Sequence, residues 1–283
     1  MEIITTVSAL QQFTKQQRQT GKRIGLVPTM GAIHRGHLSL VSASNEQCGE
    51  TIVSIFVNPL QFGPGEDFNR YPRTLENDLE LLQVAGVSAV FVPGTDEMYP
   101  AGFDTAVHIG GVTAPFEGAA RPGHFDGVAT VVLKLFLAAG ADAAFFGQKD
   151  YQQVCVIKKM VGDLNVPVEI VMCPIIREED GLAMSSRNRY LSGEERRKAV
   201  VLSQCLADAE LMVAHYHVRS SSVICQMIQD KLQTAGLSAD YVSIADPATL
   251  QEIEEIDTAA VLLLAARIGT TRLIDNTLLL YAT

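Results

Sequence analysis

The sequence predicts an α/β fold in which a parallel sheet carries helices on its faces, followed by a smaller α+β unit. Short apolar runs alternate with helical patterns through the first 175 residues. Such alternation is typical of parallel strands joined by crossover helices. From Pro174 onwards helical patterns come first and strand-like runs follow, which is typical of an α+β unit. We therefore expect two domains, residues 1–175 and 176–283.

Five apolar runs in the first unit predict the strands of the parallel sheet. Each run is continuous and rich in β-branched, aromatic or small apolar residues, as expected for strands that helices cover on both faces. The predicted strands are residues 23–27, 51–57, 89–92, 143–146 and 168–172.

Apolar residues at helical spacing predict helices between these strands. One pattern begins at Leu38, a second lies behind Thr74, and a third lies behind Asp126. Thr74 has the side chain expected of an N-cap residue. The stretch 58–73 is too long for an ordinary connection, so we expect a functional loop or lid there.

The second unit should contain two helices followed by three strands. The residues Ser192-Gly193-Glu194-Glu195 form a capping-box pattern that opens the first helix. The second helix should run from about Ser221 to Leu232 and stop near Gly236. The predicted strands of this unit are residues 241–244, 260–266 and 278–281.

Composition excludes several classes of function. The chain has 283 residues, 47% of them hydrophobic, and a formal net charge of -10 without a basic run. That charge argues against nucleic acid as the main partner. The apolar run 259–266 is far too short to span a membrane, and no signal-peptide pattern opens the sequence. Five scattered cysteines without C-x-x-C spacing are typical of reduced thiols, so we expect a cytoplasmic protein with no membrane partner.

The most informative motif, Pro-Thr-Met-Gly-Ala-Ile-His-Arg-Gly-His at residues 28–37, follows the predicted strand 23–27. His34 and His37 should share one face of the first turn of a helix. Gly36 between them would let a ligand approach the backbone. Helix N-termini attract phosphate, and imidazoles can donate hydrogen bonds to its oxygens without a permanent charge. The motif therefore predicts a phosphate site.

Three other interpretations of this histidine pair are weaker. A zinc site would need a third ligand at suitable local spacing or an H-E-x-x-H pattern, and the sequence has neither. The glycine fingerprint of dinucleotide-binding domains and the Walker A loop are also missing. Two histidines flanking a glycine are not typical of core residues either.

The loops after the other strands are further candidates, because ligands lie beyond the carboxyl ends of strands in open parallel sheets. Lys149 follows Gly147 at such an end and could supply a charge for a nucleotide phosphate, the alternative being a solvated surface lysine. Asp150 could cap the next helix or bind a ribose hydroxyl. Gln61 and Gln153 are neutral donors and acceptors, which suit a hydroxylated carboxylate better than a phosphate.

A second anion-binding motif lies far along the chain. Ser185, Ser186 and Arg187 follow the Asp180-Gly181 turn and could form a mobile clamp that closes over a triphosphate. Arg121, in the loop 117–125, could add another positive charge.

Together these motifs resemble those of the pantoate–β-alanine ligase (pantothenate synthetase) family within the HIGH-motif nucleotidyltransferase superfamily. The histidine pair and the Ser-Ser-Arg loop correspond to the two signature motifs of that superfamily. The segments that resemble the family, in its order, are 28–37, 53–62, 71–74, 121–125, 147–153, 184–188 and 273–276.

The resemblance implies a Rossmann-like N-terminal domain, a small C-terminal lid and a homodimer. It also implies a set of substrate-binding residues. Gln61 and Gln153 would bind pantoate, with Asn58 nearby. The residues that would contact ATP are Met30, Gly31, His34, Gly36, His37, Gly147, Lys149, Asp150, Ile176 through its backbone, Met184, Ser185, Ser186 and Arg187.

The implied reaction has two steps. The pantoate carboxylate attacks the α-phosphorus of ATP to give pantoyl adenylate and pyrophosphate, and β-alanine then displaces AMP to give pantothenate. Magnesium would be held by the ATP phosphates rather than by protein ligands. A carboxylate is already ionised at neutral pH, so no general base is needed, and His37 is better interpreted as a charge stabiliser. The residues expected to stabilise the growing phosphate charge are His34, His37, Lys149, Ser185, Ser186 and Arg187.

Three alternative functions fit the residues less well. Transfer of a nucleotide to a phosphorylated substrate would need a basic pocket, whereas the loop after strand 51–57 offers neutral Asn58 and Gln61. Charging of tRNA is disfavoured by the acidic net charge and the missing anticodon-binding region. A nucleotide-sensing module would not require paired glutamines beside a full phosphate clamp.

Overall fold

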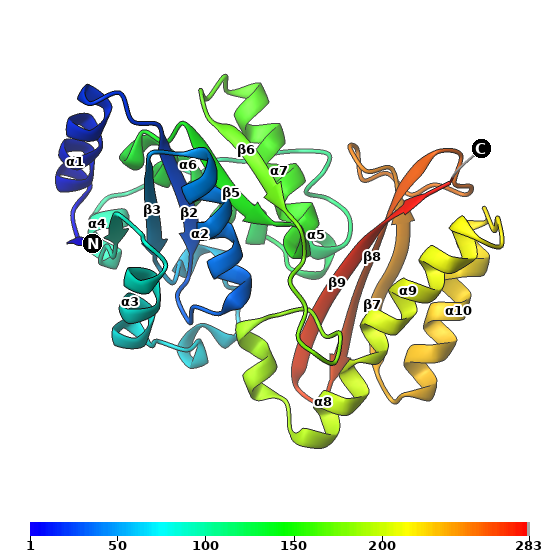
Figure 1. Cartoon of the computed structure of the whole chain (residues 1–283). Coiled ribbons are helices and arrows are strands. Elements are labelled where there is room, and N and C mark those ends of the chain that lie inside the picture. The colour runs from blue at the N-terminus through cyan, green and yellow to red at the C-terminus, as the bar shows by residue number, and fades with distance from the viewer. Residues whose placement is uncertain (282–283) are drawn as a thin grey trace.

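Six parallel strands form the larger sheet, in the order β1-β4-β3-β2-β5-β6 (Figure 1). The structure, a computed structural model, describes residues 1–281. The predicted α/β fold is confirmed. The strands are β1 (Glu2–Ile4), β2 (Ile24–Thr29), β3 (Glu50–Ile55), β4 (Ala89–Phe91), β5 (Ala143–Gly147) and β6 (Glu169–Cys173).

Successive side chains of each strand point to opposite faces of this sheet. Both faces carry apolar side chains, and helices cover both. Ile52 and Phe146 pack in the core beneath α1, α6 and α7, whereas Val53 and Phe145 pack on the other face beneath α2 and α3. The helices of this part are α1 (Val7–Gln19), α2 (Arg35–Gln47), α3 (Leu75–Val84), α4 (Thr95–Met98), α5 (Glu117–Ala120), α6 (His124–Ala139) and α7 (Tyr151–Asp163).

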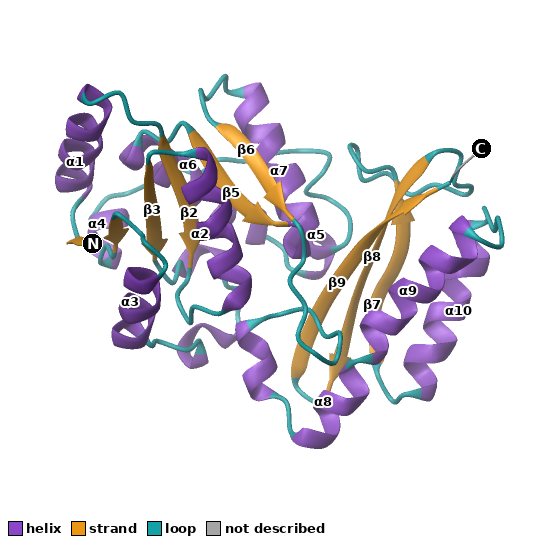
Figure 2. Ribbon diagram, viewed as in Figure 1, coloured by secondary structure: helices purple, strands orange, loops and turns teal. Residues whose placement is uncertain are grey.

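A smaller antiparallel sheet of three strands, in the order β7-β8-β9, follows with its own helices on one face (Figure 2). The capping box predicted at Ser192 and Glu195 is present at the start of α8. These elements are α8 (Gly193–Ala199), α9 (Val201–Ala214), α10 (Ser221–Thr234), β7 (Ser238–Ala245), β8 (Ala259–Ile268) and β9 (Thr271–Leu280).

The central strand β8 connects two hydrophobic cores. Leu262 and Leu264 pack against α9 and α10, while Val261 and Leu263 join the core of the larger sheet. This burial on both faces explains why residues 259–266 form an unbroken apolar run. No helix within residues 1–281 is long and apolar enough to cross a membrane.

Several predicted boundaries needed correction. The strand predicted at 278–281 is the end of β9, which begins at Thr271. The helix expected behind Asp126 already begins at His124, because Gly123 at its N-cap takes a left-handed φ of 80°. Elements β1 and α1 were not predicted. The domain boundary near residue 175 stays a prediction, and residues 174–192 form the long connection there between β6 and α8.

Candidate active site

The histidine motif forms the turn between β2 and α2, at the carboxyl edge of the larger sheet. His34 is the N-cap of α2, and its Nδ1 accepts a hydrogen bond from the Gly36 amide at 3.1 Å. The rings of His34 and His37 stack with centroids 4.0 Å apart. A Cβ atom at Gly36 would lie 2.9 Å from His34 Cε1, so glycine is needed there to make room for the capping ring.

Both imidazoles are neutral at physiological pH. Burial lowers the pKa of His34 to about 4, helped by the positive charges of Lys149 and Arg189. Burial also lowers the pKa of His37 to about 3, with His34 and Lys149 adding to the effect. Because Nδ1 of His34 accepts a hydrogen bond, its proton is assigned to Nε2. These rings can therefore donate hydrogen bonds to an anion while remaining uncharged.

A buried carboxylate that the sequence analysis missed supports this turn. Asp78 of α3 is 1% exposed and accepts hydrogen bonds from the amides of Ala32 and Ile33 at 2.9 and 2.8 Å. Gly31 beside it has φ of 82°, and a Cβ atom there would lie 3.0 Å from Asp78 Oδ2. The available signal was a carboxylate on the apolar face of a predicted helix.

Gln61 lies on the 3₁₀ turn η1 (Pro59–Gln61), which follows β3 and is capped by Asn58. The Asn58 side chain is buried and holds four protein partners, the Leu60 amide, the Tyr99 hydroxyl, the Gly127 carbonyl and Gln61 Oε1. Asn58 therefore orients Gln61 rather than presenting a free amide of its own.

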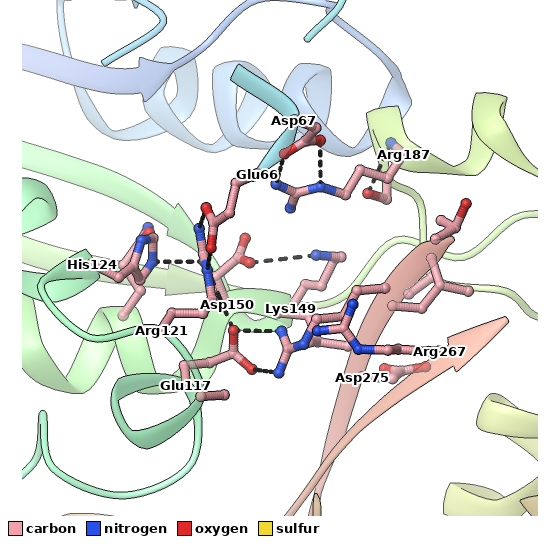
Figure 3. Close-up of a pocket in the computed structure, with 18 of the residues that line it drawn as sticks. Glu66, Asp67, Glu117, Arg121, His124, Lys149, Asp150, Arg187, Arg267 and Asp275 are labelled. Atoms are coloured by element: carbon pink, nitrogen blue, oxygen red, sulfur yellow. Dashed lines mark hydrogen bonds and ion pairs between the residues drawn. The ribbon is translucent and has the colours of Figure 1, made fainter. Parts of the chain in front are cut away.

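Lys149 lies on the 3₁₀ turn η3 (Gln148–Asp150), directly after β5. Its Nζ atom is 3.4 Å from Asp150 Oδ1, so its charge is only loosely paired. Asp150 is at the N-cap position of α7, but its side chain makes no capping hydrogen bond. The capping role considered for Asp150 is thus absent here, and its carboxylate faces the cavity beside Lys149 (Figure 3).

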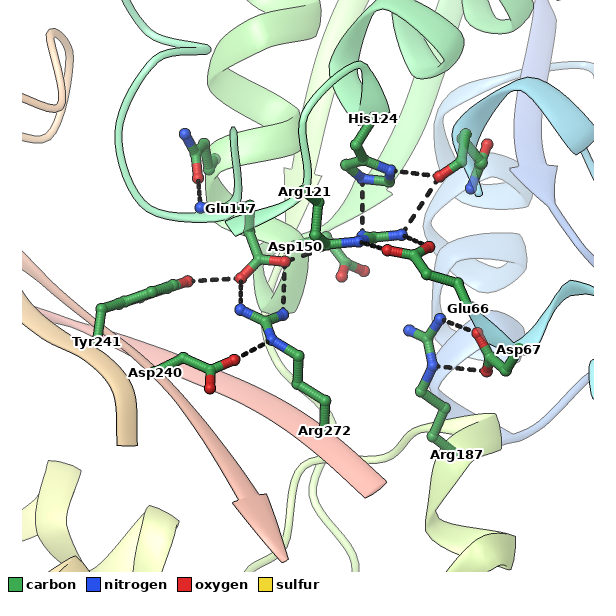
Figure 4. A network of polar contacts seen from close by, with 12 residues as sticks. Glu66, Asp67, Glu117, Arg121, His124, Asp150, Arg187, Asp240, Tyr241 and Arg272 are labelled. Atoms are coloured by element: carbon green, nitrogen blue, oxygen red, sulfur yellow. Dashed lines mark hydrogen bonds and ion pairs between the residues drawn. The ribbon is translucent and has the colours of Figure 1, made fainter. Parts of the chain in front are cut away.

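The Ser-Ser-Arg motif lies after a hairpin that is closed by the Met184 amide, which donates to the Ile176 carbonyl at 2.9 Å. Arg187 makes a two-pronged ion pair with Asp67, with both nitrogen–oxygen distances 2.9 Å (Figure 4). Ser186 is in hydrogen-bond contact with the Tyr71 hydroxyl at 3.1 Å. Asp67 and Tyr71 belong to the stretch 58–73, so that loop packs directly on the predicted anion clamp.

Arg121 is not a free cation. Its guanidinium makes two hydrogen bonds of 2.7 Å to Glu66 and contacts His124 Nε2 at 3.1 Å. Glu66 and Asp67 are neighbouring residues of the 58–73 loop. Glu66 pairs with Arg121, and Asp67 pairs with Arg187. Figure 4 shows the two pairs next to each other. Arg121 therefore holds this loop rather than adding a charge for a ligand.

One cavity of about 230 Å³ gathers nearly all of the predicted site residues. Gly31 is the exception, because it lies behind the wall against Asp78. A second cavity of about 380 Å³ lies between the two sheets and shares Lys149, Gln153 and Arg187 with the first. The predicted residues that line the smaller cavity are Met30, His34, Gly36, His37, Asn58, Gln61, Gly147, Lys149, Asp150, Gln153, Ile176, Met184, Ser185, Ser186 and Arg187.

The cavity therefore brings two kinds of side chain together. Neutral imidazoles, an ammonium group and hydroxyls line it together with the neutral amides of Gln61 and Gln153, and Gln61 Nε2 contacts Met30 Sδ of the histidine motif at 3.3 Å. Within residues 1–281, no group of three or more His, Cys, Asp or Glu side chains is placed to hold a metal ion. Such a cavity suits an anion whose charge changes beside a second, hydroxylated ligand.

Comparison with known proteins identifies the family. The family model for pantoate-beta-alanine ligase matches residues 2–278. A pantothenate synthetase of Acetivibrio thermocellus is 52% identical over 98% of both chains, and one of Rhodopirellula baltica is 50% identical over the whole of both.

Solved structures agree with the sequence relatives. Pantothenate synthetase from Thermus thermophilus is 46% identical, with a TM-score of 0.92 over 98% of this chain and 99% of that one. Pantoate-beta-alanine ligase from Francisella tularensis, solved with beta-gamma ATP and beta-alanine, is 32% identical with a TM-score of 0.82 over 98% and 97% of the chains. The chain described here therefore belongs to the pantoate–β-alanine ligase family, whose members are also named pantothenate synthetases.

Proposed function

We propose that this enzyme joins pantoate to β-alanine through a pantoyl-adenylate intermediate and releases AMP and pyrophosphate. The observation that carries the proposal is that a single cavity gathers both kinds of side chain. Its neutral imidazoles and Lys149 suit the phosphates of ATP, and its paired glutamines suit a hydroxylated carboxylate. The Francisella relative solved with beta-gamma ATP and beta-alanine supports two of the three substrates.

In the first step the pantoate carboxylate attacks the α-phosphorus while the bond to pyrophosphate breaks. Gln61 and Gln153 would hold pantoate, and Asn58 would fix the amide of Gln61. The carboxylate is already ionised at neutral pH, so the step requires no protein base. Magnesium would arrive with ATP and leave with pyrophosphate.

Charge growing on the phosphates would be stabilised by fixed donors. His34, His37 and Lys149 are the donors placed at the start of α2 and at the end of β5, and Ser185 and Ser186 line the same cavity. Preorganised donors of this kind usually make the largest contribution to such reactions. Arg187 can join them only if the phosphates compete with Asp67 for its guanidinium.

In the second step the neutral amine of β-alanine attacks the acyl carbon of pantoyl adenylate. The carbon–nitrogen bond forms as the bond from the acyl carbon to the AMP oxygen breaks, and the nitrogen loses one proton to water and keeps the other in the amide. The pyrophosphate has departed by then, so the histidine pair should matter less than in the first step. A homodimer and a cytoplasmic location stay predictions for this chain.

The test separates the two steps. His37→Ala should slow formation of pantoyl adenylate from ATP and pantoate by about 100- to 1,000-fold, the usual cost of one such donor. Attack of β-alanine on synthetic pantoyl adenylate should slow far less. Single-turnover experiments with detection by mass spectrometry give both rates.

His108→Ala is a matched control, because the His108 side chain is 77% exposed and pairs only with Asp126. It should leave both rates unchanged. Equal losses in the two steps for His37→Ala would contradict a role in stabilising the phosphates. Failure of the wild-type enzyme to accumulate an acyl adenylate without β-alanine would overturn the proposed reaction.

A further inference from the structure

Asn276 in β9 reaches across from the smaller sheet to the turn that carries Lys149. Its side chain is buried, and Nδ2 donates to the carbonyl oxygens of Gln148 and Lys149, both at 2.9 Å. Its Oδ1 accepts from Gln148 Nε2 at 3.3 Å. One amide group thus holds two consecutive carbonyls and one side chain of η3.

The turn η3 has little support of its own. It is a three-residue 3₁₀ segment, and no side chain caps its start at Gly147. Hydrogen bonds in 3₁₀ turns have poorer geometry than those in α-helices, so such a short segment does not fix its own conformation. The Lys149 ammonium has one polar partner within residues 1–281, the Asp150 carboxylate at 3.4 Å. The position of Lys149 therefore depends on what holds its backbone.

We propose that Asn276 is a positioning residue, which fixes the Lys149 backbone so that the ammonium group meets the phosphates of ATP. The inference rests on the role proposed above for Lys149. An asparagine suits this position because its amide provides two donors for two carbonyls together with one acceptor. An aspartate would place negative charge against both carbonyl oxygens, and an alanine would leave them without their partner.

The neighbouring residue strengthens the inference. Asp275 is 2% exposed and pairs with Arg177 at 2.6 and 3.1 Å, and Arg177 lies at the base of the hairpin that precedes Ser185. Two consecutive residues of β9 therefore hold both the Lys149 turn and the hairpin of the Ser-Ser-Arg motif. Figure 3 shows Lys149 and Asp275 in the wall of the larger cavity.

A double-mutant cycle tests the proposal. Pantoate-dependent exchange of pyrophosphate into ATP would be measured for Asn276→Ala, Lys149→Ala and the double variant of the full-length enzyme. Asn276→Ala should lower kcat by about 10- to 100-fold, the effect expected of a misplaced catalytic group. In the Lys149→Ala background the same change should cost almost nothing further, because its effect acts through Lys149.

Two further variants make the outcome unambiguous. Asn276→Asp keeps the size of the side chain and should lower kcat at least as much as Asn276→Ala does. It provides a second test of this position if the alanine variant fails to fold. Thr277→Val is the control, because the Thr277 hydroxyl bonds Glu210 of α9, away from the site; it should retain the wild-type rate. If Asn276→Ala lowers the rate equally in both backgrounds, Asn276 merely supports the fold and the proposal is wrong. A Lys149→Ala enzyme with near wild-type activity would instead overturn the role of Lys149 itself.

Discussion

At the scale of single residues, the site works with uncharged histidines. The pKa values of about 4 and about 3 for His34 and His37 lie well below the ordinary 6.5, chiefly because both rings are buried near Lys149. A neutral ring can donate from one nitrogen while the other accepts, as the Gly36 amide requires of His34. A doubly protonated ring would lose that capping bond.

The first prediction is that neither ring takes up a proton between pH 7.5 and 5. Ring-proton resonances, assigned with His34→Gln and His37→Gln, should stay at the neutral position through this range, while free histidine titrates as the reference. Titration of either ring with a midpoint near 6.5 would contradict the burial argument.

The same pKa values affect stability. The unfolded chain binds more protons than the native state between pH 6.5 and about 4, since its histidines have ordinary pKa values there. The free energy of unfolding should therefore be highest above pH 6.5 and should decrease as the pH falls through this window. Urea unfolding at pH 7 and pH 5 measures the decrease, which should be smaller for a His34→Gln, His37→Gln double variant.

The sequence was informative about the candidate site residues, whose catalytic roles stay predictions, and less informative about the residues that hold them. His34 and Lys149 stand out because they follow strand ends, and Ser185 stands out because it opens the Ser-Ser-Arg run. The roles of Asp67 and Asn276 could not be predicted, because each acts through a contact with a residue far away in the chain. Such pairings follow from the tertiary fold, which local patterns do not encode.

At the scale of elements, close packing of α6 on η1 places Gln61. A Cβ atom at Gly127 would overlap the Leu60 carbonyl and lie 2.7 Å from the backbone nitrogen of Gln61. The Gly127 carbonyl also accepts a hydrogen bond from Asn58 at 3.1 Å. Glycine within a helix usually lowers stability. At position 127 it leaves room for the 3₁₀ turn η1, which packs directly against α6.

The second prediction concerns this contact. Gly127→Ala should destabilise the fold by about 1–3 kcal/mol through overpacking and should raise KM for pantoate more than KM for ATP. Gly162→Ala in α7 is the control, since a Cβ atom there would have nothing within 4 Å and alanine favours a helix by up to about 1 kcal/mol. Thermal unfolding measures the loss of stability, and steady-state kinetics with each substrate varied in turn measure the two KM values. Equal changes in both KM values would indicate general loosening of the site instead.

Elements were predictable where burial imposed a clear pattern. The continuous strands β3 and β5 are covered on both faces and were found within a few residues. The helix α1 was missed because it is mostly polar and buries only Leu10, Phe13 and Thr14. Strand β1 has three residues, too few for a periodic signal.

At the scale of the whole molecule, an ion-pair network joins helix α5 to the smaller sheet beside the site. Glu117 of α5 accepts two hydrogen bonds from Arg272 of β9, at 2.7 and 2.6 Å, and one from the Tyr241 hydroxyl (Figure 4). Burial raises the pKa of Glu117, but these partners outweigh it and hold the pKa below its ordinary value. The carboxylate stays charged because Arg272 and Tyr241 of the smaller sheet donate hydrogen bonds to it and Arg272 carries the opposite charge.

The third prediction is that Arg272→Met destabilises the protein strongly. The remaining Glu117 carboxylate is buried, and removing one partner of a buried pair typically costs about 3–5 kcal/mol. The double variant with Glu117→Gln should recover part of that loss, because it removes the buried carboxylate that has lost its main partner. Lys159→Met removes a pair in which both side chains are 52% exposed, so it should cost at most about 1 kcal/mol. Chemical denaturation measures the free energy of unfolding of each variant. If Arg272→Met costs no more than Lys159→Met, the Glu117–Arg272 pair contributes little to stability.

The contact between Asn276 and the Lys149 turn also has a consequence for the order of events during folding. Asn276 lies close to the end of the chain, and its partners are 127 and 128 residues away. Contacts of such long sequence separation form late, because the intervening chain must first be ordered. The strands β2, β3 and β5 can pair before β9 exists, whereas the Lys149 turn gains its last support only when β9 docks. Before β9 docks, the Lys149 turn would thus lack its partner amide, and the contact proposed between Lys149 and the phosphates of ATP would be completed only after the smaller sheet has packed.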